Sequence, residues 1–298
     1  MPDSPETVLK KTFPTLGDVE FKIATTPREM EGALTLVFRE YAKRRLILRE
    51  KYKHEIRVAR QHLLPDTRVF VSRKDGEVIA TLSVFMDSPL GLPLDSGYHD
   101  EFQTLRDQGR KIGEAGYFAV KGGLFRGKTA AEVSMEKLSF IVTLFRMAIQ
   151  YGLFHAGADD ACFVTNPDPK RLFFKYFPIE KFGEVKHFGF DEMHVKPKPA
   201  IAKRMNLREL RASMRNPFKL LKLHNAIFRL FIGRRLPDAL FKPRLQLTPA
   251  DLRHFFVEQS DVLKNLSPDE RKYVLSLYPL SPTERDALAD VAAGGETL

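Results

Sequence analysis

Cysteine and tryptophan are the scarcest residues of this sequence, which has one cysteine, Cys162, and no tryptophan in 298 residues. A single cysteine excludes a disulfide within the chain. No apolar run approaches the roughly 20 residues that a bilayer-spanning helix needs. The N-terminal segment MPDSPETVLKKTFPTLGDVE is polar and mixed in charge, unlike a secretory signal peptide. We therefore expect a soluble protein of the cytoplasm, with Cys162 in its core.

Acidic residues are scarce in two stretches of the chain, whose formal net charge is +10. From Ala200 to Leu245 there are 12 basic and 2 acidic residues, and from Arg39 to Arg60 there are 9 and 3. Such blocks favour an anionic partner (nucleic acid, membrane lipid or an acidic protein), and solvated basic faces without a partner are the alternative. The basic, apolar segment 217–232 fits a peripheral contact with the inner membrane, docking of an acidic partner, or packing on its own domain.

Hydrophobic periodicity and turn signals predict a mixed α/β domain followed by helices. An N-terminal arm (1–18), a domain (19–205) and a basic helical extension (206–298) are the expected parts. Helix starts are indicated at Thr26-Pro27, Thr248-Pro249, Ser267-Pro268 and Ser281-Pro282. Residues 46–64 fit either a helix or a loop. The expected elements of the domain are a strand at VEFKIAT, a hairpin turning at Asp75-Gly76, a helix at HDEFQTLRDQGR, a strand at KIGEAGYFAVK, a long helix from Thr129, a buried strand at DDACFVTN, a short helix at NPDPKRLFFKYF, and final strands at EKFGEVKHF and DEMHVKPK.

The stretch Gly122–Thr129, GGLFRGKT, spells G-x-x-x-x-G-K-T, the phosphate loop of nucleotide hydrolases. A strand, a Gly-rich loop and a helix N-terminus form an anion site, because unpaired amides and the helix dipole point the same way. The hairpins around the loop disfavour ATP, since nucleotide hydrolases alternate strand and helix around a parallel sheet. We expect a different phosphate here, held by Arg126, Gly127, Lys128 and Thr129.

The order of elements resembles the GCN5-related N-acyltransferase fold, where a loop after the fourth strand holds the phosphate of a pantetheine arm. The stretch ATLSVFMDSPLGLPLDSGYHDEFQTLRDQGRKIGEAGYFAV is similar to bacterial N-acyl amino acid synthases, relatives of the acyl-homoserine-lactone autoinducer synthases. The segments ALTLVFREYAKRR and VTNPDPKRLFFKYFPIEKFGE resemble the same proteins, so the resemblance covers about residues 19–205. It implies a mixed, mostly antiparallel sheet flanked by helices, with a helical C-terminal extension. It also implies acyl transfer from acyl carrier protein to the amino group of an amino acid.

The resemblance also implies roles for particular residues. Glu114 matches the glutamate of the motif E-x-x-x-F-A-V, and a carboxylate there can take the proton of an attacking ammonium group. A carboxylate paired with Arg110 is the structural alternative. Backbone amides near Phe118, Ala119 and Val120 would polarise the thioester carbonyl. Arg39 and Asn166, which lie in the two other matching segments, are further candidates.

Two departures from the related families bear on the mechanism. Autoinducer synthases carry Ser-Arg where this chain has Gly116-Tyr117, and 46–64 lacks their acidic pair, which disfavours S-adenosylmethionine as acceptor. The tyrosine that often protonates the leaving thiolate is missing, because alignment on Asn166-Pro167 places Leu172-Phe173 there. Tyr176, nearly one helical turn later, is the candidate substitute.

The most economical interpretation is therefore a fatty acyltransferase that uses the phosphopantetheine thioester of acyl carrier protein as co-substrate and binds no cofactor. The eight histidines show no ligand spacing, so we expect no metal. We expect no nucleic acid either. Two alternatives remain open: an acetyl- or acyl-CoA-dependent N-acetyltransferase, and a non-catalytic module of the same fold that binds membrane or nucleic acid.

Overall fold

The computed structural model describes residues 18–123, 130–167, 178–188, 198–216 and 235–292. Its centre is a mixed sheet of eight strands, in which β1 to β5 follow one another, β8 lies beside β5, and β6 and β7 both pair with β8. The pairing of β4 with β5 is parallel and the other described pairings are antiparallel. The strands are β1 (Glu20–Ile23), β2 (Arg68–Lys74), β3 (Glu77–Met86), β4 (Ile112–Val120), β5 (Asp160–Thr165), β6 (Glu180–Lys181), β7 (Lys186–Phe188) and β8 (Lys198–Asn206).

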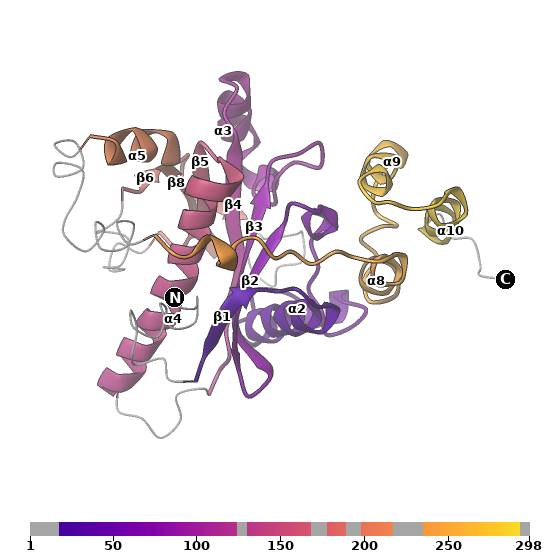
Figure 1. Cartoon of the computed structure of the whole chain (residues 1–298), viewed down its shortest axis with the longest axis horizontal. Helices are drawn as coiled ribbons and strands as arrows, with labels where there is room; N and C mark the ends of the chain where they lie inside the picture. Colours follow the sequence, from indigo (N-terminus) through magenta and orange to yellow (C-terminus); the bar gives the residue numbers. More distant parts are fainter. Residues whose placement is uncertain (1–17, 124–129, 168–177, 189–197, 217–234, 293–298) are drawn as a thin grey trace.

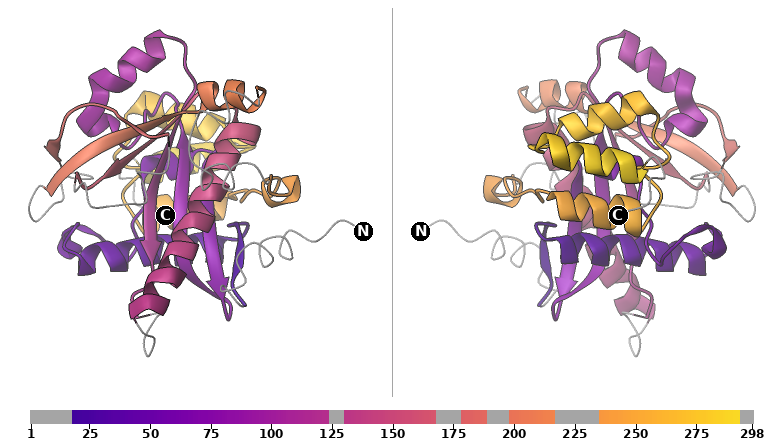
Figure 2. Two further views of the ribbon diagram at one scale, coloured as in Figure 1. Left: turned by 90° about the vertical axis from the view of Figure 1, so that its left-hand side faces the viewer. Right: turned by 90° about the vertical axis from the view of Figure 1, so that its right-hand side faces the viewer.

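Helices cover both faces of this sheet (Figure 1). Helix α4 (Ala130–Tyr151) lies diagonally across one face, and a π-helical turn, Gly152–Ala156, continues it. Figure 2 shows α2 (Pro27–Lys43) and the C-terminal helices over the opposite face. Helix α3 (Asp95–Asp107) stands at one end of the sheet, and α5 (Leu207–Met214) follows β8. The described part of the chain thus has the predicted mostly antiparallel α/β architecture with helices on both sides.

Local signals place several elements where the sequence predicts them. Thr26 caps α2 by accepting a hydrogen bond from the Glu29 amide at 3.2 Å, with Pro27 in the first turn. The β2–β3 hairpin turns at Asp75 and Gly76, which both have positive φ angles (51° and 79°), as a type I′ turn requires. Residues 46–64 form a loop with two 3₁₀ turns, Arg49–Lys51 and Arg60–Leu63.

The structure differs from the sequence prediction at the start of α3 and at β8. Helix α3 begins at Asp95, inside the stretch predicted as loop, because burial of Tyr98 and the contact from Asp95 to the Leu92 amide order its first turn. Strand β8 was not predicted, whereas the predicted strand DEMHVKPK (191–198) lies, except for Lys198, outside the described residues. The alternation of β8 is hidden by Lys203 and Arg204, and Arg204 is held in the sheet by an ion pair with Asp160.

The C-terminal segment crosses from one face of the sheet to the other. The Leu236 amide donates to Gln150 Oε1 of α4 at 2.7 Å, and the chain then runs past the end of β1 to the far side (Figure 1). There α8 (Pro249–Arg253), α9 (Pro268–Ser276) and α10 (Pro282–Ala292) pack against the start of α2. One hydrophobic cluster joins Met30, Leu34 and Leu63 to side chains of these helices. The boundary at residue 205 itself stays a proposal.

Candidate active site

Glu114 lies in β4 opposite Phe85 of β3, on the sheet face that α2 and α3 cover. Its side chain is only 3% exposed, and its Oε2 accepts a hydrogen bond from the Leu94 amide at 2.9 Å. Burial raises the pKa of Glu114 to about 8, while the Leu94 hydrogen bond lowers it and the charge of Asp95 raises it further. A carboxyl group with a pKa near the working pH is suited to accept and release a proton.

An ionic cluster fixes the loop that carries Leu94. The Asp95 carboxylate accepts a hydrogen bond from the Leu92 amide at 2.6 Å. The Arg106 guanidinium donates to both Asp87 and Asp95 at 2.7–2.9 Å, which ties α3 to the end of β3. The predictions from sequence did not include Arg106, because only the fold brings the three charges together.

The sheet opens directly beside Glu114. The parallel pairing of β4 with β5 covers three residue pairs, from Ile112–Asp160 to Glu114–Cys162, although both strands continue. Cys162 is fully buried in this paired part, as predicted for a core residue. Past this point β5 stays with β8, so a gap separates β4 from β5. Glu114 therefore stands at the closed end of a split in the sheet.

A β-bulge in β4 lies along this gap. Tyr117 has a φ of 54°, and the register with β3 shifts between Thr81 and Ser83. The Lys121 amide donates a hydrogen bond to the Ile79 carbonyl at the start of β3. Successive amides of a strand point to opposite sides, so the Ala119 amide, two residues earlier, also points toward β3. The amides of Phe118 and Val120 then point the other way, toward the gap.

Aromatic rings close the gap on the side of α4. Phe145 of α4 contacts Phe118 of β4 and Phe163 of β5, with ring centroids 5.8 and 6.3 Å apart. An apolar cavity of about 40 Å³ lies behind them, lined by side chains of α4, β3, β4, β5 and β8. The α4 side of the gap is therefore lined mainly by apolar side chains.

A second group that sequence reasoning missed surrounds His62. The His62 ring packs edge-on against Phe85 and Tyr117, and its Nδ1 accepts a hydrogen bond from the Ala59 amide at 3.0 Å. Burial lowers the pKa of His62 to about 3, so the ring is neutral. The Arg57 guanidinium lies 4.3 Å from the centre of the Tyr117 ring, a cation–π contact. These contacts hold the bulge from the side of α2.

The structure brings some predicted site residues together and separates others. Asn166 is exposed at the end of β5, at the open end of the gap. Arg39 points to solvent and pairs with Glu55 at 3.3 Å, away from Glu114. Arg110 pairs with Asp160, and Glu114 accepts a hydrogen bond from the Leu94 amide instead. The alternative in which Glu114 pairs with Arg110 is therefore wrong. Arg126–Thr129, Tyr176 and segment 217–232 lie outside the described residues, and their roles stay predictions.

The end of α2 lies beside the start of the Gly-rich loop. The Gly122 amide donates to Glu40 Oε1 at 2.7 Å, and a methyl group on Gly122 would come within 2.8 Å of Lys43 Nζ. The exposed run Lys43, Arg44 and Arg45 therefore borders the point where this loop begins.

Comparison with known proteins decides the family. The profile of the N-acyl amino acid synthase FeeM family matches residues 32–193, more than half of the chain. The chain belongs to this family. Membership in the FeeM family makes the protein an N-acyltransferase. No curated protein sequence matches the chain significantly.

Three solved structures are similar to this chain to different degrees. FeeM, an N-acyl amino acid synthase from uncultured soil microbes, is 24% identical, with a TM-score of 0.50 over 65% of this chain and 93% of its own. The acyl-homoserine-lactone synthase LasI is 14% identical, with a TM-score of 0.42 over 77% of this chain and 97% of its own. BjaI, a CoA-dependent acyl-homoserine-lactone synthase, is 13% identical, with a TM-score of 0.43 over 67% and 90%.

Metal-binding clusters and membrane-spanning helices are both absent from the described ranges. No cluster of three or more histidine, cysteine or carboxylate side chains there could hold a metal ion. Within those ranges, no helix is both long and apolar enough to cross a membrane.

The charge of Asp95 provides a test of proton transfer at Glu114. Because a nearby negative charge raises the pKa of Glu114, Asp95→Asn should lower it. In a plot of kcat/KM against pH, the rising limb that reports an ionised Glu114 should then move to lower pH. The acceptor amine titrates in the same way in assays of the wild type and of Asp95→Asn, so a shift of the limb between the two enzymes reports a group of the protein. Asp107→Asn, at the other end of α3, should leave the limb in place, and an unmoved limb in Asp95→Asn would count against Glu114.

Proposed function

We propose that this enzyme transfers a fatty acyl chain from acyl carrier protein to the amino group of a free amino acid, with Glu114 as general base. The observation that carries the proposal is the buried Glu114 carboxyl, with a raised pKa, at the closed end of the β4–β5 gap. Family membership supports the amino acid as acceptor, since the family is described as N-acyl amino acid synthases.

The proton acceptor has room beside it. Oε2 of Glu114 accepts the hydrogen bond from the Leu94 amide. Oε1 of Glu114 lies near Gly116, because a methyl group added to Gly116 would be 3.5 Å from this oxygen. The absence of a side chain at Gly116 keeps this side of the carboxyl group clear. An amine, or a water that relays its proton, can therefore approach Oε1.

In the proposed step the amine nitrogen gives its proton to Glu114 and attacks the thioester carbonyl carbon. A C–N bond forms and the C–S bond breaks. Pantetheine leaves as a thiolate, which takes the second proton that nitrogen loses, or as a thiol protonated by Tyr176, whose oxygen then takes that proton. The Phe118 and Val120 amides, which point toward the gap, would stabilise the oxyanion of the tetrahedral intermediate. The apolar wall of Phe118, Phe145 and Phe163 favours a hydrocarbon chain over an acetyl group.

The basic end of α2 supports a carrier protein as donor. Acyl carrier proteins are strongly acidic, and their pantetheine phosphate would bind at Arg126–Thr129. Lys43, Arg44 and Arg45 border the start of that loop, so an acidic protein docked there would present its arm to the β4–β5 gap.

The donor preference tests this proposal against the acetyl-CoA alternative. We expect acyl carrier protein to exceed the matching acyl-CoA in kcat/KM at least about tenfold at low salt, a difference of roughly 1.4 kcal/mol. The advantage should shrink as salt is raised, because exposed charges are screened over about 8 Å at physiological ionic strength. The double variant Arg44→Glu, Arg45→Glu should lose it while its turnover of acyl-CoA stays unchanged.

A matched control is the double variant Arg253→Glu, Lys264→Glu. It reverses two exposed charges of the C-terminal segment, one at the end of α8 and one in the turn before α9, and should keep the preference. Equal use of both donors at every salt concentration would favour a CoA-dependent transferase. No transfer from either donor would favour the non-catalytic module.

A further inference from the structure

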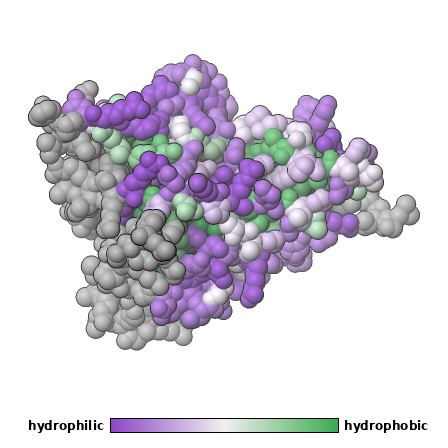
Figure 3. All heavy atoms as spheres, viewed as in Figure 1, coloured by the Kyte–Doolittle hydropathy of each residue, from purple (hydrophilic) through white to green (hydrophobic). Residues whose placement is uncertain are grey.

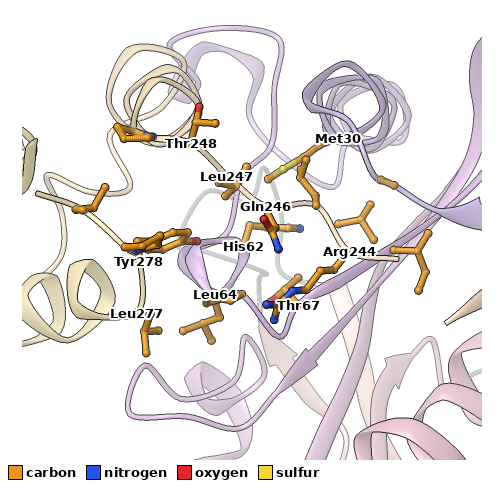
Figure 4. Close-up of a pocket in the computed structure, with 18 residues that line it drawn as sticks. Met30, His62, Leu64, Thr67, Arg244, Gln246, Leu247, Thr248, Leu277 and Tyr278 are labelled. Carbon is orange, nitrogen blue, oxygen red and sulfur yellow. The ribbon is translucent and has the colours of Figure 1, made fainter. Parts of the chain in front are cut away.

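A second and larger cavity lies between the acyltransferase sheet and the C-terminal segment (Figure 4). Its volume is about 420 Å³, within the range of roughly 300–1,000 Å³ that small-molecule sites occupy. The end of β1 and the start of β2 form one wall, and residues 244–249 and 277–280 form the other. Figure 3 shows hydrophobic side chains reaching the surface between the sheet and the C-terminal helices.

The C-terminal wall is separate from the part of the chain that defines the family. The family profile ends at residue 193, whereas this wall begins at Arg244. The wall is nevertheless firmly attached, because the Tyr278 hydroxyl donates to the Leu63 carbonyl at 2.5 Å and Leu280 belongs to the same hydrophobic cluster as Met30. Close-packed interiors leave few voids larger than a water molecule, so a cavity of this size between two packed walls is a feature of the fold.

The lining of this cavity is mostly apolar and carries little charge. Most of the lining is apolar, with Met30, Leu64, Leu247 and Leu280 around the space. Among the described residues that line it, Arg244 is the one charged side chain, since none of them is a carboxylate and His62 is neutral. Arg244 is exposed and forms no ion pair with any residue in the described ranges. An apolar space with an exposed guanidinium group in its lining complements an apolar ligand with one anionic group.

We propose that this cavity binds an amphipathic carboxylate, either a free fatty acid or an N-acylated amino acid, with its carboxylate on Arg244. The hydrocarbon chain then lies against Met30, Leu64 and Leu247. This site is distinct from the gap at Glu114. The paired residues Val69, Ser83 and Gly116 step across β2, β3 and β4, which places Val69 of the cavity wall roughly 10 Å from the bulge at about 4.8 Å per strand. His62 lies between the two sites, because it lines the cavity and also packs against Tyr117 of the bulge. The proposal does not depend on the proposed reaction.

Titration calorimetry on the full chain tests it with dodecanoate, N-dodecanoylglycine and the uncharged dodecanol. We expect saturable binding of at least one carboxylate, at least about tenfold tighter than that of dodecanol. Arg244→Gln should abolish this advantage without weakening the binding of dodecanol. Lys242→Gln, which removes an exposed charge two residues away and outside the lining, should change nothing. The tighter of the two carboxylates identifies the source of the ligand.

Fluorescence locates the bound molecule, because the sequence has no tryptophan. Leu277 is 38% exposed at the rim, so Leu277→Trp introduces a single reporter at this cavity. A change of emission on adding the carboxylate, or loss of its binding because the indole fills the space, supports the proposal. Unchanged affinity and unchanged emission in Leu277→Trp would overturn it. In the calorimetry, the proposal would also be overturned if no carboxylate bound saturably, or if the wild type and Arg244→Gln bound the carboxylate equally well. An equal loss of affinity in Arg244→Gln and Lys242→Gln would overturn it too.

Failure of this site is distinguishable from failure of the proposed function. Glu114→Gln should bind the carboxylate as the wild type does, and Arg244→Gln should transfer acyl groups at the normal rate. Binding that disappears in Glu114→Gln and persists in Arg244→Gln would place the ligand in the β4–β5 gap and overturn the proposal.

Discussion

Replacing Glu114 by glutamine should lower the rate of acyl transfer by about 10²–10⁴-fold, the usual contribution of a general base. The amide has nearly the same shape as the carboxyl group and can still accept the hydrogen bond from Leu94, so the fold should persist. It cannot take the proton of the ammonium group at any pH. The measurement is kcat/KM with a saturating acyl carrier protein donor over the whole accessible pH range.

Glu77→Gln is a suitable control for this experiment. Glu77 also lies in the central sheet, but its side chain is 68% exposed and pairs with Lys121. Its loss should leave the rate within about twofold of the wild type, since exposed ion pairs contribute roughly 0–1 kcal/mol. A near-normal rate in Glu114→Gln would remove this residue from the mechanism.

Glu114→Gln should raise the stability of the folded protein although it lowers the rate of acyl transfer. The pKa of Glu114 is raised from its ordinary value of 4.5 to about 8, so the folded protein binds a proton that the unfolded chain releases between these values. The contribution of this group to stability therefore falls as pH rises from about 4.5 to about 8. Glu114→Gln removes that penalty, and the gain in Tm over the wild type should be larger at about pH 9 than at about pH 5. No such trend would mean that the carboxyl group is less desolvated than its burial indicates.

Local chemistry explains how much of the fold could be predicted from the sequence. The cap at Thr26, the turn at Asp75-Gly76 and the capping boxes at Ser267 and Ser281 each act within a few residues. Such signals mark where elements begin and end, whatever the rest of the chain does. The identity and position of Glu114 came from a resemblance in sequence, because a glutamate in a strand does not by itself reveal its surroundings.

The surroundings of Glu114 could not be predicted because they are tertiary. Asp95 affects its pKa only because Arg106, eleven residues later, ties the start of α3 to the end of β3. His62 supports the bulge from a loop whose sequence suggested only a basic surface. The positive φ of Tyr117 follows from packing on His62 and Arg57, and no glycine marks that position. Strand β8 was missed for the same reason, since a tertiary ion pair holds its charged residues.

That ion pair is the basis of the second large effect we expect. Asp160 is fully buried at the start of β5, and its carboxylate accepts hydrogen bonds from Arg110 of the loop between α3 and β4 and from Arg204 of β8, the latter at 2.7 Å. Asp160→Asn keeps the shape but removes the charge that two guanidinium groups share. Losing one partner of a buried pair typically costs 3–5 kcal/mol. Because Arg110 and Arg204 remain 10% and 18% exposed, we expect a loss near the lower end, about 3 kcal/mol in the free energy of unfolding.

Urea unfolding measures this loss as a lower midpoint with an unchanged m-value. Glu180→Gln is the matched control, because Glu180 pairs with the same Arg204 at 2.9 Å but is 55% exposed, and its loss should cost less than about 1 kcal/mol. Equal losses in the two variants would show that burial does not set the strength of the pair. Asp160 is also paired with Ile112 of β4, at the first of the three residue pairs that precede the gap. A destabilised start of β5 should therefore disturb the closed end of the gap, so that Asp160→Asn, unlike Glu180→Gln, also loses acyl transfer at temperatures where it remains folded.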